Sequence, residues 1–168
     1  PVNTLSPEFA TEIFHRSDTL VGWFIGVYGI GAVLAGIWVS GQPLAGDRQL
    51  ATRQALIMVG FVVFASTSLL PVAIVGLVLG GFAFIATSAA ALTRVQQRTD
   101  PSEHGRLMAV WSMAFMGSRP LAGVVGGAIA SFTGVRIATY VLAVPSALAA
   151  SIMWRRGATG ILRRTHPA

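Results

Sequence analysis

Long uncharged segments, separated by short charged ones, dominate the pattern of this chain. The clearest segment runs from residue 54 to residue 93, forty positions without a charged side chain, and Pro71 lies near its middle. A helix that spans a bilayer needs about 20 predominantly apolar residues. We therefore predict two membrane-spanning helices in this segment, joined by a tight hairpin at Leu70-Pro71.

The same pattern covers most of the chain and predicts an all-α fold, a polytopic membrane bundle of five transmembrane helices. The predicted spans are 19–40, 54–70, 72–93, 107–131 and 137–154. Residues 1–18 are predicted to be an extracytoplasmic segment with a short interfacial helix. Its start is indicated by Ser6-Pro7-Glu8, which combines a capping hydroxyl, a first-turn proline and an acid near the positive helix end. Residues 155–168 are predicted to be a cytoplasmic basic tail.

Composition agrees with a membrane protein and argues against an enzyme. Hydrophobic residues make up 54% of the chain and charged residues 11%, whereas soluble domains carry about 25% charged residues. The chain has no cysteine, its three histidines are scattered, and every acid lies in a predicted loop. Because no nucleophile–base pair and no metal-ligand spacing occurs, we expect neither catalysis, nor a cofactor, nor a metal site.

The arginines, which are the only basic residues besides histidine, predict the orientation in the membrane. If five helices alternate, one side holds nine of them, namely Arg48, Arg53, Arg94, Arg98, Arg106, Arg155, Arg156, Arg163 and Arg164, and the other holds Arg16 and Arg136. Cytoplasmic loops collect basic residues, so we expect a cytoplasmic C-terminus and an external N-terminus. Arginines confined to short loops do not indicate a nucleic-acid partner. The odd helix count, the external start and Pro1 in place of Met lead us to expect a further helix before residue 1.

Arg119 is the only charged residue inside a predicted span, near the bilayer midplane. A charge at that depth costs about 2.5–3.5 kcal/mol and usually faces a bundle interior or a wet cavity. One interpretation is a solute- or anion-facing role, shared with Ser112 on the same side of the helix. A second is a structural role, in which the guanidinium ties helices together through backbone carbonyls, and a third is that the side chain extends to the membrane interface. Pro120 removes the hydrogen bond to the carbonyl of Met116, so we expect a kink there.

Other polar residues within the spans are Tyr28, Thr87 and Ser88. These side chains could line a solute pathway. The alternative for the hydroxyls is a hydrogen bond to the backbone of their own helix, which is common for Ser and Thr.

Two segments resemble a known transporter family. Residues 100–109 (DPSEHGRLMA) and 114–123 (AFMGSRPLAG) are similar to the junction of helices ten and eleven in the major facilitator superfamily. The subgroup that they resemble is that of bacterial exporters related to the enterobactin exporter. Residues 7–14 (PEFATEIF) are similar to the segment after helix seven of that group, and the glycine-rich stretch 22–36 is similar to its helix eight.

The resemblance implies that the five spans are helices eight to twelve of a twelve-helix carrier built from two six-helix halves, with the solute bound near the midplane between them. It implies a cytoplasmic gate that includes Asp47, Arg48, Asp100, Gly105 and Arg106. The partners would be the lipid bilayer, a small-molecule solute and the N-terminal half of the same transporter.

The expected function is therefore that of the C-terminal half of a secondary active transporter in a bacterial inner membrane. We expect export by alternating access and no transport by this fragment alone. The alternative is a small, non-transporting membrane subunit with an accessory or assembly role.

Overall fold

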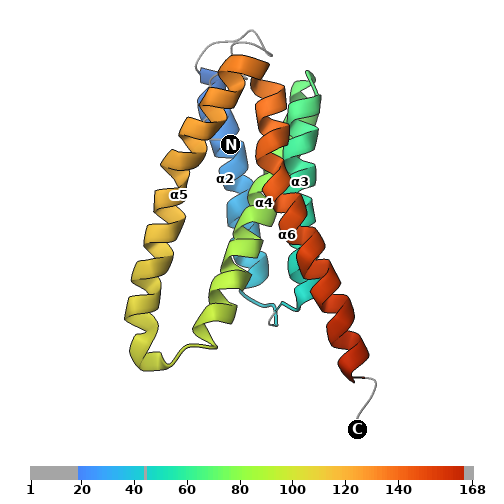
Figure 1. The fold of residues 1–168 in the computed structure, drawn as a ribbon. Helices are drawn as coiled ribbons and strands as arrows, with labels where there is room; N and C mark the ends of the chain where they lie inside the picture. Colours follow the sequence, from blue (N-terminus) through green and yellow to red (C-terminus); the bar gives the residue numbers. More distant parts are fainter. Residues whose placement is uncertain (1–18, 44, 165–168) are drawn as a thin grey trace.

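Five long helices run back and forth through the computed structural model, which describes residues 19–43 and 45–164 (Figure 1). They are α2 (Thr19–Val39), α3 (Asp47–Ser66), α4 (Leu70–Gln96), α5 (His104–Thr133) and α6 (Val135–Arg164), with a 3-10 turn, η2 (Pro101–Glu103), before α5. Each long helix has the length and hydropathy to cross a bilayer, and no strand occurs in the described ranges. The prediction of an all-α bundle with five membrane-spanning helices is confirmed.

The helix ends gather in two groups because the helices alternate in direction (Figure 1). One group contains the end of α2, the start of α3, the end of α4, the start of α5 and the end of α6, and we call it the Arg94 end. The other group surrounds the turn between α5 and α6, and we call it the Gly134 end. This up-and-down order is the one that the count of arginines on each side assumes.

Several helix boundaries differ from the predicted spans. α3 begins at Asp47 rather than at residue 54, so its first turns are polar. The break between α3 and α4 lies at residues 67–69, and Pro71 is in the first turn of α4, where no intrahelical donor is needed. α6 continues to Arg164, into the predicted tail. The predicted interfacial segment, 1–18, lies outside the described residues, as does the end of the tail from residue 165.

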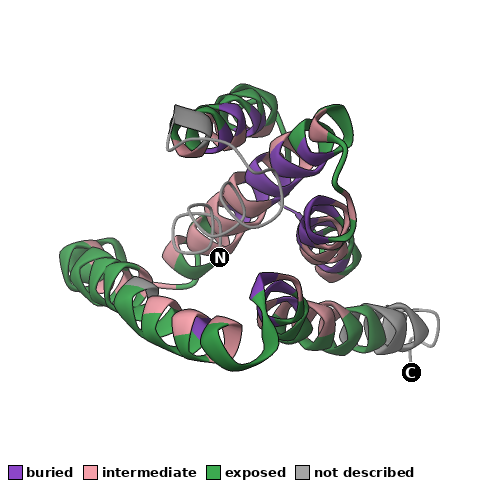
Figure 2. Ribbon diagram, turned by 90° about the horizontal axis from the view of Figure 1, so that it is seen from above, coloured by how far each residue is buried: buried purple, intermediate pink, exposed green. Residues whose placement is uncertain are grey.

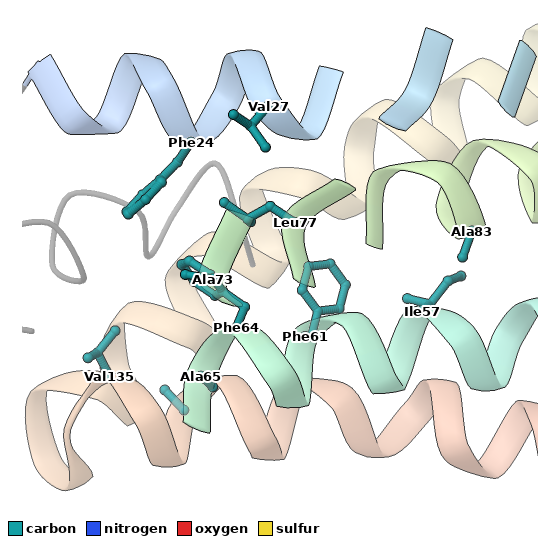
Figure 3. Close-up of a cluster of buried hydrophobic side chains, with 11 residues drawn as sticks. Phe24, Val27, Ile57, Phe61, Phe64, Ala65, Ala73, Leu77, Ala83 and Val135 are labelled. Atoms are coloured by element: carbon teal, nitrogen blue, oxygen red, sulfur yellow. The ribbon is translucent and has the colours of Figure 1, made fainter. Parts of the chain in front are cut away.

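α4 lies at the centre of the packed part of the bundle. It packs against α2 and α3, and α3 packs in turn against α6. The main apolar core fills these contacts, with Phe24 of α2 edge-on to Phe64 of α3 at a centroid distance of 5.5 Å and Leu77 of α4 fully buried (Figure 3). The other buried members are Val27, Ile57, Phe61, Ala65, Ala73, Ala83, Val135 and Ala138.

Glycines bring the backbones of α3 and α4 into direct contact. A Cβ atom added at Gly60 would lie 2.7 Å from the amide nitrogen of Gly80 and 2.8 Å from the carbonyl oxygen of Gly76. Gly31 of α2 makes a similar approach to the backbone of Val78 on α4. Since lipid tails are as apolar as the side chains, such close packing is a main source of helix association in a bilayer.

α5 stands apart from this core, and most of its residues are exposed (Figure 2). Its main contacts are with α6 and with η2. Gly126 of α5 lies against Leu142 of α6 near the turn, and Gly134 makes the reversal possible with φ of 86°, in the left-handed region that favours glycine. α5 therefore packs against the bundle mainly at its Gly134 end.

Candidate solute pathway and charge network

Arg119 and Pro120 lie in the middle of α5, as the sequence predicts, and the helix continues through both. The side chain of Arg119 lies outside the described part of the chain, so the interpretations of its role stay predictions. Its neighbours Ser118, Pro120 and Leu121 are exposed. Ser112, predicted to share the Arg119 side, is exposed as well.

The hydroxyl of Thr87 donates to the carbonyl of Ala83 in its own helix, at 2.7 Å. A hydrogen bond to its own helix is the alternative to a pathway role that the sequence left open for Thr87. Ser88 is half-buried on the same helix. Tyr28 is half-buried on α2, where its ring lies 6.4 Å from that of Phe84 on α4.

Tyr28 is one end of a row of aromatic rings that crosses three helices. Phe84 of α4 lies 5.8 Å from Phe115 of α5, and Phe115 stacks on Trp111 at 6.4 Å. The contact between Phe84 and Phe115 bridges α4 and α5, whose backbones are otherwise apart. Sequence reasoning missed Phe84 and Phe115 because an aromatic residue in an apolar span carries no signal of its neighbours.

The Arg94 end holds an ion pair between two helices. Nη1 of Arg94, in the last turn of α4, lies 2.7 Å from Oδ1 of Asp47, in the first turn of α3. Each residue also complements the dipole of its own helix, with an acid at the positive end and a base at the negative end. Asp47 was predicted at the gate, but its partner was not.

Arg53, predicted to be a loop arginine, is inside α3 and only 7% exposed. Nη1 donates to the carbonyl oxygen of Ala86 on α4 at 3.1 Å, and Cζ lies 4.9 Å from the ring centroid of Trp38 on α2. The cation thus joins three helices. The earlier start of α3 is the reason, because it turns position 53 toward α4.

The remaining predicted gate residues lie on the connection from α4 to α5. Oδ1 of Asp100 accepts hydrogen bonds from the backbone nitrogen and the hydroxyl of Ser102, at 2.9 and 2.6 Å, and these bonds lower the pKa of the Asp100 carboxyl. Nε2 of His104 lies 3.0 Å from the carbonyl oxygen of Gln96. Gly105 has open space around it and Arg106 is exposed.

The predicted gate residues form separate groups in this structure. Asp47 pairs with Arg94, and Arg48 lies over the ring of Trp154 on α6. Within the described ranges, no hydrogen bond or ion pair joins Asp47 or Arg48 to Asp100 or Arg106. The start of α5 is not packed against α3, which explains the separation.

Comparison with known proteins gives one match. The family model described as Major Facilitator Superfamily matches residues 2–166. No curated protein and no solved structure shows a significant match to this chain.

Proposed function

Since this chain belongs to the Major Facilitator Superfamily, a family of membrane transporters, we propose that it is the C-terminal half of a secondary active transporter that exports a small molecule by alternating access. Its five helices would be helices eight to twelve of a twelve-helix carrier. The proposed setting is the inner membrane of a bacterium, with the C-terminus in the cytoplasm and the N-terminal half of the same transporter as partner. On this proposal the fragment alone does not transport.

The observation that carries the proposal is the exposure of α5 on both sides of position 119. A charge near the midplane of a bilayer costs about 2.5–3.5 kcal/mol unless protein or water surrounds it. The residues beside Arg119 are exposed, with Leu121 at 69%, and α5 packs mainly against α6 and η2. A second helical half against α5 would cover this exposed stretch of the helix.

The proposed pathway lies along α2, α4 and α5, the helices that the row of aromatic rings connects. Arg119 would contact the solute or its anionic group, with Tyr28, Ser88, Thr87 and Ser112 along the same route. At the Arg94 end, the Asp47–Arg94 pair would hold α3 to α4 while the connection around Asp100, Gly105 and Arg106 moves with α5.

The test compares three proteins in bacterial cells: the product of the gene with its upstream coding sequence, the 168-residue chain alone, and the chain co-expressed with the upstream part. Energy-dependent efflux is measured with a panel of fluorescent solutes. We expect efflux from the first and third proteins and none from the second. Efflux by the chain alone equal to that of the longer product would refute the assignment as a half.

A substitution tests the role of Arg119 in the longer product. Arg119→Ala should reduce efflux while the amount of protein in the membrane is unchanged, and Arg98→Ala, at an exposed arginine of the Arg94 end, should leave efflux intact. Unchanged efflux with Arg119→Ala would remove Arg119 from the solute path. A start codon directly before Pro1 would favour the accessory subunit instead.

A further inference from the structure

His104, the first residue of α5, bonds back to the end of α4. Its Nε2 lies 3.0 Å from the carbonyl oxygen of Gln96, the last residue of α4, and 3.3 Å from that of Thr99 in the connection. A carbonyl oxygen only accepts hydrogen bonds, so Nε2 is the ring nitrogen that donates. The last carbonyls of a helix have no intrahelical partner, and a histidine donor satisfies them. His104 therefore caps α4 from the start of α5.

The same side of α5 contacts α4 again farther along the helix. Met108 follows His104 by one helical turn, and its sulfur lies 3.5 Å from Nε2 of the Gln96 side chain. Phe115 follows two turns later, and its ring lies 5.8 Å from that of Phe84 on α4. Residues spaced by three or four positions lie on one face of a helix. We call His104, Met108 and Phe115 the α4-facing stripe.

The contacts of the α4-facing stripe are important because α5 is otherwise held at its opposite end. Within the described ranges, α5 packs mainly against α6 and η2, and Gly126 lies against Leu142 of α6 near the turn at Gly134. A helix that is packed at one end can tilt and rotate at the other unless side chains there restrict it. The spacing and rotation of the start of α5 therefore depend on His104 and the rest of the stripe.

Position 119 lies on the same side of α5 as the α4-facing stripe, because it follows Phe115 by one helical turn. At a rise of 1.5 Å per residue, it is about 22 Å from His104 along the helix axis. A rotation of α5 at its start would turn position 119 away from α4. His104 can thus determine which way position 119 faces without any contact with a solute.

We propose that His104 is a positioning residue for the solute pathway. In the conformation that the structure shows, its hydrogen bonds to the end of α4 fix the spacing and rotation of α5, so that position 119 faces α4. Movement of α5 at the Arg94 end requires these bonds to break. The link to transport rests on the proposed function of the chain, whereas the contact between His104 and α4 does not.

The contact is tested by solid-state NMR on the chain in lipid bilayers, with ¹⁵N in the histidine rings and ¹³C in the glutamine backbone carbonyls. His15 and His166 are replaced by asparagine, so that His104 gives the ring signals. We expect dipolar dephasing to be stronger at Nε2 than at Nδ1. Gln96→Leu removes the label at the acceptor and should abolish the effect, while Gln97→Leu should leave it. Equal dephasing at both nitrogens, or its persistence in Gln96→Leu, would overturn the contact.

The positioning role is tested with spin labels at Val95→Cys on α4 and Val110→Cys on α5, both exposed, in a chain without native cysteine. One hydrogen bond shifts an equilibrium roughly two- to tenfold. We expect His104→Leu to lower the ratio of short to long distances by a factor in that range. His104→Gln, whose side-chain amide also donates, should restore the short distance, and Gln97→Leu, at an exposed site, should not change it. An unchanged distribution in His104→Leu would overturn the positioning role.

Efflux by the longer product tests the link to transport. His104→Leu should reduce efflux and His104→Gln should retain it, at equal amounts of protein in the membrane. Normal efflux by His104→Leu with a widened distance distribution would overturn the link to position 119. The NMR and spin-label measurements need no transport, so absence of efflux from the unsubstituted product would refute the proposed function without deciding the contact of His104, which they decide.

Discussion

Gly60→Ala should destabilise the bundle more than the addition of a single methyl group suggests. The added methyl group would meet three backbone atoms of α4, the amide nitrogen and Cα of Gly80 and the carbonyl oxygen of Gly76, at 2.7, 2.9 and 2.8 Å. Ordinary contact begins at 3.4 Å, and backbone atoms in a helix cannot rotate away as a side chain does. The two helices must therefore move apart by several tenths of an ångström.

That separation weakens the whole α3–α4 contact. A gap of about 0.5–1 Å forfeits a quarter to a half of the dispersion energy of the facing atoms. Overpacking of this kind typically costs about 1–3 kcal/mol, and we expect a loss of free energy of unfolding in that range. Alanine is the better helix former, by about 0.8–1.0 kcal/mol, and this gain acts in the opposite direction.

The matched control is Gly26→Ala on α2, where an added Cβ meets nothing within 4 Å. Both substitutions add one methyl group to a glycine in a spanning helix, so the helix-propensity gain is common to both. Unfolding by sodium dodecyl sulfate, followed by circular dichroism, should show Gly60→Ala less stable and Gly26→Ala as stable as the wild type or more so. Equal stability of the two variants would refute the close approach of α3 and α4.

Three further predictions concern orientation, acidity and the ion pair. Because the chain has no cysteine, Leu69→Cys should react with a membrane-impermeant maleimide in intact cells and Ser102→Cys only after permeabilisation, and the opposite pattern would invert the proposed orientation. Hydrogen bonds from Ser102 lower the pKa of Asp100, so they stabilise the η2 turn above the usual aspartate range and this contribution is lost as the pH falls through the lowered pKa. Ser102→Ala should therefore raise the Asp100 pKa in a carboxyl NMR titration, and no change would exclude the Ser102 hydroxyl as a cause. Arg94→Gln should cost less than about 1 kcal/mol in the same detergent unfolding assay, because its pair with Asp47 is partly exposed, and a larger loss would mean that the pair is effectively buried.

The sequence predicted the features that follow from hydropathy and charge alone. The uncharged segment from residue 54 to residue 93 predicted two spans, and the five helices alternate in direction, as the count of arginines on each side assumed. Helix ends were less predictable, because polar residues such as Asp47 and Arg48 extend α3 beyond its apolar part. The partner of Asp47 was not predictable either, since Arg94 is distant in sequence and only the packing of α3 on α4 brings the two together.

Arg53 shows why a charge at a span end is hard to interpret. On the sequence it borders an uncharged segment, which is typical of a loop arginine. In the structure, the same side chain is buried between the carbonyl of Ala86 and the ring of Trp38. Burial of an arginine is acceptable there because a backbone carbonyl and an aromatic face replace part of its hydration. The helical periodicity of α3 determines on which face of the helix position 53 lies. The neighbours that make its burial possible come from α2 and α4.

α5 presents the opposite problem. The sequence predicts the position of this helix but not what surrounds it. In a soluble protein an exposed apolar face must find a partner, but in a bilayer lipid covers Val124 and Phe132, which are 74% and 90% exposed, as well as protein would. Apolar exposure therefore does not distinguish a lipid-facing helix from one that lacks a protein neighbour. A charge does distinguish them, since lipid cannot solvate a guanidinium at the midplane. What surrounds Arg119 in the membrane therefore distinguishes a transporter half from a complete small subunit. A measurement at that one residue tests both hypotheses.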